Sequence, residues 1–274
     1  DIDVFIVNNE GENNSLYRNE GNGEFLRITT GAIVNDGGHS VGASWADFNN
    51  DEYPDLFVTN SSNENDFLYQ NNGDGTFTKT SGFEPTLAGG NSHGSAWVDT
   101  DNDGDLDLFI TDDRGLNRLY LSSKNAAELV LVNPLQLPLV GSGLNNFATA
   151  WADYDLDGDV DAYVTNHSEQ QDAFYLNTST TNTSVHSVLN TQEGSYSAIG
   201  ARVKIKIGST SQWMTRFVQS LSGGGTGGQN DMRLSIGIGE ATAIDSIVIY
   251  WPSGQEQIIT DLDATQSNQN CIQI

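Results

Sequence analysis

Cysteine and basic residues are scarce in this sequence and a long apolar run is absent, and each of these shortages argues against a class of protein or site. The one cysteine, Cys271, excludes an internal disulfide framework and a zinc site built from cysteines. Lysine and arginine total 11 against 37 acidic residues, and the net charge of −26 disfavours nucleic acid and anionic membrane surfaces as partners. The longest apolar stretch, residues 129–140, is broken by polar residues and prolines, so we expect no membrane span.

Glycine and acidic side chains are abundant, and the acidic ones are unevenly placed. Glycine occurs 29 times and aromatic residues make up 9% of the chain, which favours a globular, turn-rich β protein over a disordered acidic segment. Residues 1–183 hold 30 acidic and 6 basic side chains, whereas residues 184–274 hold 7 and 5. A polar stretch at 179–184 separates the two regions, so we expect two domains, 1–183 and 184–274.

The first region is a repeat. Three segments align directly, at residues 42–60, 94–112 and 148–166, and their first aspartates lie 52 and 54 residues apart. A partial copy opens the chain, because DIDVFIVNN resembles DLDLFITDD in the segment at 94–112. The region therefore holds about three and a half copies.

The patterns predict β-strands throughout. In each full copy an apolar run ending in tryptophan precedes an acidic loop, and further β-rich runs follow. Four short strands per copy are typical of a β-propeller blade, which is stable only when it is stacked on neighbours. After residue 184, apolar and polar residues alternate in several runs. We expect an all-β chain, with propeller-type blades followed by an antiparallel, β-sandwich-like domain.

The acidic loops have the spacing of a calcium site. In the loop 99–107, carboxylates occupy positions 1, 3, 5 and 9, and Gly104 occupies position 6, where the chain must turn sharply. Side-chain oxygens at positions 1, 3 and 5 and a backbone carbonyl at position 7 can converge on one hard cation. The loop 47–55 has Glu52 in place of the glycine, so we expect it to bind a cation most weakly.

Oxygen ligands without histidine favour Ca²⁺ over transition metals, and the lack of flanking helices indicates structural sites. We predict about three such Ca²⁺ sites, one for each full copy. The candidate ligands are Asp47, Asn49, Asp51, Tyr53 and Asp55 in the first loop, Asp99, Asp101, Asp103, Asp105 and Asp107 in the second, and Asp153, Asp155, Asp157, Asp159 and Asp161 in the third.

These loops and their strands resemble the FG-GAP/VCBS repeats of extracellular β-propellers such as integrin α subunits. The resemblance covers roughly residues 1–176 and implies a propeller with calcium in the loop between the first two strands of a blade. About three and a half copies do not complete a ring of 4–8 blades. We therefore expect either that the chain is the C-terminal part of a longer protein or that another molecule supplies the missing strand.

The second region resembles the ASPIC/UnbV domain. The elements that carry the resemblance are AIGARVKI at 198–205, the glycine-rich run at 222–231, RLSIGIG at 233–239 and WPSG at 251–254. In the family this domain follows VCBS repeats in acidic secreted proteins. The resemblance therefore implies an architecture and an extracellular location more than an activity.

No catalytic constellation emerges from the sequence. Residues 38–42 fit G-x-S-x-G with Ser40 at the centre, but that pattern needs a helix after the serine, and a strand is predicted there. The four histidines show no metal-ligand spacing. We therefore expect a protein that is not an enzyme and has no cofactor besides Ca²⁺.

The leading hypothesis is a secreted, calcium-binding repeat protein that acts in adhesion, extracellular matrix or surface and filament assembly. Its partners would be other extracellular proteins, glycans, or copies of itself paired through the incomplete first blade. Two alternatives are a lectin-like, glycan-binding propeller and an accessory region of a larger secreted enzyme. Glycosylation would use the N-x-[ST] sequons at Asn13, Asn60, Asn166, Asn177 and Asn182.

Overall fold

The computed structural model describes residues 2–122, 129–132, 137–140, 145–179, 182–189, 198–208, 213–219, 228–264 and 271–273. Nearly all regular structure in these ranges is β-strand, and the helical turns among them are the short 3₁₀ segments η1 (Ala32–Val34) and η2 (Glu84–Thr86). In the described chain we find no helix with the length and apolar character needed to cross a bilayer. The all-β prediction is confirmed.

Four small antiparallel sheets, which we call blades, follow one another along the described part of the first region. The first blade contains β1 (Val4–Ile6), β2 (Ser15–Gly21) and β3 (Glu24–Ile28). The second contains β4 (Ser40–Ala46), β5 (Asp55–Asn60), β6 (Phe67–Asn71) and β7 (Phe77–Lys79). The third contains β8 (Ser92–Val98), β9 (Asp107–Asp112), β10 (Arg118–Ser122) and β11 (Leu129–Leu131), and the fourth contains β12 (Asn146–Ala152), β13 (Asp161–Asn166) and β14 (Ala173–Tyr175).

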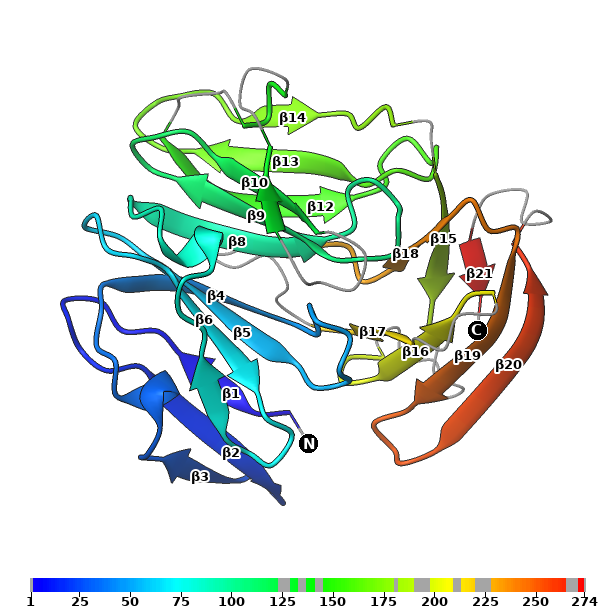
Figure 1. Cartoon of the computed structure of the whole chain (residues 1–274), viewed down its shortest axis with the longest axis horizontal. Coiled ribbons are helices and arrows are strands. Elements are labelled where there is room, and N and C mark those ends of the chain that lie inside the picture. The colour runs from blue at the N-terminus through cyan, green and yellow to red at the C-terminus, as the bar shows by residue number, and fades with distance from the viewer. Residues whose placement is uncertain are drawn as a thin grey trace.

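Neighbouring blades are held together by shared apolar clusters and by a repeated threonine bridge. Figure 1 shows the blades following one another along an arc. The cluster between the second and third blades includes Phe57 and Trp97, which pack edge to face with ring centroids 6.3 Å apart. Thr59 Oγ1 donates to the carbonyl of His93 at 2.7 Å, and the equivalent Thr111 donates to that of Phe147 at 2.9 Å. Each blade therefore depends on its neighbour for burial, as a stacked repeat should.

The C-terminal domain contains two sheets that enclose one apolar core. The first has the order β17 (Met214–Phe217), β16 (Arg202–Lys206), β19 (Ala243–Tyr250) and β20 (Glu256–Asp263), all antiparallel. The second has the order β18 (Leu234–Gly239), β15 (Thr183–Val188) and β21 (Cys271–Gln273), and the β15–β21 pair is parallel. The sequence patterns indicated only antiparallel pairing, because alternation marks a strand but not its partner. Most of the glycine-rich run that we singled out, residues 222–227, lies outside the described residues.

Candidate metal centres

The three acidic loops share one backbone conformation although their sequences differ. Each connects the first two strands of its blade, and its fourth and sixth residues have positive φ. The values are 57° at Asn50 and 78° at Glu52, 57° at Asn102 and 99° at Gly104, and 63° at Leu156 and 101° at Gly158. The sharp turn expected at position 6 is therefore present in every loop. Glu52 adopts it without the freedom of glycine, at a cost of about 1–2 kcal/mol.

The loop 99–107 gathers three of its predicted ligands. Asp99, Asp101 and Asp103 each offer an oxygen atom within 4.8 Å of the other two. Asp99 is only 2% exposed, and its Oδ1 has no hydrogen-bond partner. An unpaired carboxylate oxygen that is buried among like charges is unfavourable, and a hard cation would satisfy it. The residues of this loop therefore fit a Ca²⁺ ion.

The loop 153–161 gathers a second cluster, formed by Asp153, Asp155 and Asp161. Asp153 is 4% exposed, and its Oδ1 also has no hydrogen-bond partner. Its Oδ2 lies 3.3 Å from Nε2 of His186, a residue of β15. Burial holds the pKa of His186 below its usual range, so the imidazole is neutral near pH 7. This cluster also fits a hard cation, and His186 is a neighbour that the spacing of the histidines did not suggest.

The loop 47–55 uses its oxygens differently. Both carboxylate oxygens of Asp47 accept backbone N–H groups of the loop, from Asp51 and Glu52, at 2.9 Å each. The amide of Asn49 donates to Oδ2 of Asp51 at 2.9 Å, and Asp51 Oδ1 accepts the N–H of Tyr53 at 2.9 Å. Among the described residues, acidic groups gather in threes only in the other two loops. Clusters of three acidic groups are therefore present in two of the three predicted sites, and the site in the loop 47–55, which includes the amide of Asn49, stays a prediction.

The ninth residue of each loop attaches the loop to the third strand of its blade. One oxygen of each aspartate accepts a backbone N–H at the end of that strand or two residues after it: Asp55 from Asn71 at 2.8 Å, Asp107 from Ser122 at 2.8 Å and Asp161 from Asn177 at 2.9 Å. The second oxygen of Asp107 accepts from Thr100, as that of Asp161 accepts from Tyr154, and of these two aspartates Asp161 belongs to the cluster of its loop. The second oxygen of Asp55 is buried without a partner.

The residues at position 7 connect neighbouring loops, a role that the spacing of the carboxylates did not reveal. Asn50 Nδ2 donates to Oδ1 of Asp105 at 3.2 Å, and Asn102 Nδ2 donates to Oδ1 of Asp159 at 2.6 Å. The fourth residue of one loop is thereby bonded to the seventh residue of the next. Asp157, in the third loop, accepts the N–H of Asp159 at 3.0 Å. The shared asparagine at position 4 of the first two loops was the signal that could have identified this bridge.

Burial raises the pKa of several loop carboxyls. The pKa of Asp47 rises to about 6, that of Asp99 to about 7 and that of Asp55 to about 8, with desolvation as the largest cause in each case. Neighbouring aspartates add to the effect, because a second negative charge disfavours ionisation. Ionisation of these carboxyls is therefore unfavourable in the metal-free loops, and a bound cation would favour the ionised form.

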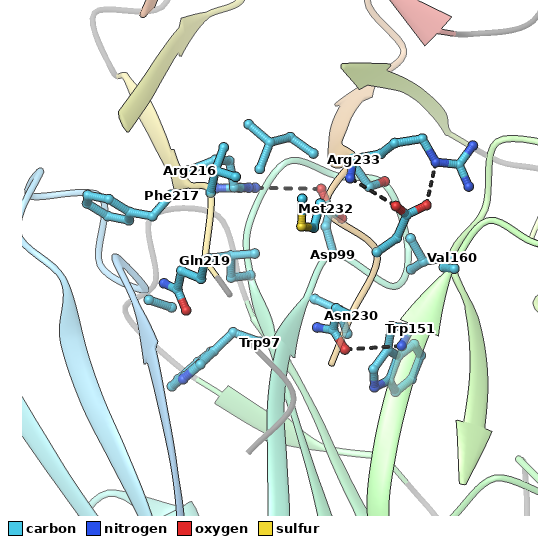
Figure 2. A pocket seen from close by; sticks show the side chains of 18 of the residues that line it. Trp97, Asp99, Trp151, Val160, Arg216, Phe217, Gln219, Asn230, Met232 and Arg233 are labelled. Atoms are coloured by element: carbon cyan, nitrogen blue, oxygen red, sulfur yellow. Dashed lines mark hydrogen bonds and ion pairs between the residues drawn. The ribbon is translucent and has the colours of Figure 1, made fainter. Parts of the chain in front are cut away.

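The C-terminal domain lies directly against these loops. The Arg216 side chain of β17 is 6% exposed and places Nη2 3.9 Å from Oδ2 of Asp99, the ion pair drawn in Figure 2. A cavity of about 120 Å³ lies at this junction, and Trp97 and Trp151 line it from the blades. Asn230 Oδ1 accepts the backbone N–H of Trp151 at 3.1 Å on the other side. Sequence reasoning could not find Arg216, because more than a hundred residues separate it from Asp99.

The chain is therefore a β repeat protein. Each full repeat is a small blade with an acidic loop between its first two strands, and a second β domain packs against these loops. The chain belongs to the FG-GAP-like repeat family, whose model matches residues 1–58, 47–110 and 99–164. The model described as ASPIC and UnbV matches residues 191–269. Both resemblances drawn from the sequence, and their order, are confirmed. A search of curated proteins found no match.

Proposed function

We propose that this chain is a non-catalytic, calcium-stabilised repeat protein that works outside the cell in adhesion, matrix or surface assembly. FG-GAP-like repeats are typical of extracellular or surface proteins, and that membership supports the location. The calcium part rests on one observation: each gathered cluster contains a buried carboxylate oxygen without a partner, on Asp99 and on Asp153. Partners would be other extracellular proteins, glycans or further copies of the chain.

The experiment for the calcium part is a calorimetric titration of the metal-free chain with Ca²⁺ and, separately, with Mg²⁺. The wild type should bind two Ca²⁺ ions, and Asp101→Asn and Asp155→Asn should each lose one of them. Asp74→Asn is the matched control, because Asp74 lies in the exposed turn between β6 and β7. Absence of Ca²⁺ binding by the wild type, or an equal number of sites in all variants, would contradict the proposal.

The environment of Ser40 supports a function without catalysis. Ser40 is the first residue of β4 and is 2% exposed. Its hydroxyl donates to Oδ1 of Asn60 at 2.9 Å and accepts from the side chain of Asn14 at 3.0 Å. A serine nucleophile needs a basic partner and access to substrate. The G-x-S-x-G match is therefore best explained as part of a strand.

A groove at the other end of the blades favours glycan binding as a second candidate function. The groove has a volume of about 420 Å³, and Asn91, His93, Asp113, Arg114 and Phe147 are among its lining residues. The rings of His93 and Phe147 lie 4.5 Å apart, and polar groups surround them. In contrast, Tyr69 and Tyr120, at equivalent positions in the second and third blades, are fully buried, and Tyr17 and Tyr175 are partly buried. A glycan array with the wild type and Phe147→Ala tests this function, and equal binding by both would contradict it.

A further inference from the structure

The C-terminal domain contacts the sixth residue of all three acidic loops, using a different strand for each. Lys204 Nζ of β16 lies 2.6 Å from Oε1 of Glu52. Nη2 of Arg216, in β17, donates to the carbonyl of Gly104 at 2.9 Å. Ser184 Oγ of β15 donates to the carbonyl of Gly158. Three equivalent positions in three blades therefore meet one domain.

The contact with the loop 99–107 is the closest of the three. A Cβ atom on Gly237 of β18 would lie 2.3 Å from Oδ2 of Asp99 and 2.4 Å from the carbonyl carbon of Asn102. The N–H of Gly239 donates to the carbonyl of Asn102 at 2.9 Å. The loop therefore packs against the strand backbone with no room for a side chain at position 237.

Asp99 belongs both to this contact and to the acidic cluster. Its Oδ2 accepts the N–H of Gly237 at 3.0 Å, together with the N–H of Gly104 at 3.0 Å inside the loop. Its Oδ1 has no hydrogen-bond partner and belongs to the residue that groups with Asp101 and Asp103. One oxygen of Asp99 therefore serves docking of the C-terminal domain, and the other is available to a cation.

We infer that the C-terminal domain is a clamp that holds the blades by the sixth residue of each acidic loop, and that its docking and cation binding strengthen each other through Asp99. The coupling rests on the proposed calcium function, whereas the clamp does not. When domain docking and cation binding favour the same conformation of Asp99, each strengthens the other by the same free energy. A docked domain orients Asp99 for the cation, and a bound cation fixes Asp99 for Gly237.

The first test follows amide hydrogen exchange in the metal-free full chain. Gly237→Ala should increase the exchange of residues 99–105 and 234–239 by about tenfold or more, because the new Cβ separates the strand from the loop. Ser235→Ala is the matched control, since it introduces the same side chain two residues earlier in β18 and should leave exchange unchanged. Unchanged protection in Gly237→Ala would overturn the clamp.

A second variant keeps the test decisive if Gly237→Ala does not fold. Lys204→Met removes the ion pair with Glu52 and should increase exchange of residues 47–53, whereas Lys206→Met, in the same strand, should not. Equal exchange in the two lysine variants would also overturn the clamp.

The coupling is tested by Ca²⁺ calorimetry on the same proteins. Gly237→Ala should weaken one site by about tenfold, within the 5–150-fold range of ordinary coupling energies, and Ser235→Ala should not. Equal affinities would overturn the coupling while the exchange data still decide the clamp. If the wild type binds no Ca²⁺, the proposed calcium function fails and the metal-free exchange experiment remains valid.

Discussion

Asn102 donates its side-chain N–H to Oδ1 of Asp159 at 2.6 Å and so connects the acidic loops of two neighbouring blades. Asn102 is 1% exposed and has a φ of 57°, a conformation that asparagine tolerates better than most residues. Asn102 therefore adopts a left-handed backbone conformation and also forms a hydrogen bond to the next blade.

Two substitutions of Asn102 separate the effect of its backbone conformation from that of its hydrogen bond to Asp159. Asn102→Gly keeps the backbone conformation and loses the bond to Asp159, so it should lower the free energy of unfolding by about 1–3 kcal/mol. Asn102→Leu should lower it further, by about 1 kcal/mol, because leucine resists the left-handed conformation. Chemical denaturation of both variants measures the difference, and equal stability of the two would contradict the assigned backbone cost.

At Glu52 the positive φ should lower the free energy of unfolding, whereas the ion pair with Lys204 should raise it. Glu52→Gly relieves the positive φ but removes the partner of Lys204, so its net effect on the free energy of unfolding should be near zero. In a Lys204→Met background the ion pair is already absent, and the same change should stabilise the chain by about 1 kcal/mol. A double-mutant cycle by thermal melting measures this, and identical effects in both backgrounds would refute it.

Asp101→Ala should destabilise the chain much more in Ca²⁺ than in chelator. A ligand at 100 times its dissociation constant stabilises the folded state by about 2.7 kcal/mol, which corresponds to roughly 5–10 °C in Tm for a chain of this size. Burial and the neighbouring Asp103 raise the pKa of Asp101, so in chelator the loss of its charge should cost little. Thermal melts in millimolar Ca²⁺ and in EGTA check this.

The matched control for that melt is Asp74→Ala, which should shift Tm by the same amount in both buffers, because Asp74 lies in an exposed turn where its carboxylate accepts hydrogen bonds from Thr76. Equal losses for Asp101→Ala in the two buffers would mean that the aspartate serves packing alone.

The buried Asp66 should make the metal-free chain less stable as pH rises from about 4 to about 6. Asp66 is 2% exposed, and burial raises its pKa from 3.8 to about 6 even though Arg118 lies 3.2 Å away and opposes the shift. Between these values the folded chain binds more protons than the unfolded chain, so unfolding is favoured as protons are removed. Asp66→Asn should flatten this part of the profile in denaturation at several pH values. Parallel profiles would rule the effect out.

The blades could be predicted from sequence because their signals are local. In each full copy a tryptophan, an acidic loop and a β-rich run such as LFVT at 56–59 follow one another. The strands β4, β8 and β12 each end one residue after the tryptophan, which is Trp45, Trp97 and Trp151 in turn. The pairing of β15 with β21 could not be predicted, since the two strands are far apart in the chain and neither pattern names its partner.

The candidate site could be predicted only as far as the local spacing of residues determines it. The clusters around Asp99 and Asp153 follow from the spacing of carboxylates in a loop. The different arrangement of the loop 47–55 depends on backbone hydrogen bonds to Asp47, which spacing does not reveal. The contacts of Arg216 and Lys204 arise from tertiary packing alone.

The ion pair between Glu52 and Lys204 also sets the registry of the two domains. The acidic loops are close copies, so a domain that recognises the sixth residue could in principle dock one blade out of step. Such a shift would place Lys204 opposite Gly104, which has no side chain at the position where Glu52 now pairs with it. The shifted arrangement would lose the 2.6 Å contact between Lys204 and Glu52, so the observed register is the favoured one. The loop 47–55, which has Glu52 in place of glycine, is thus the loop whose side chain specifies where β16 docks.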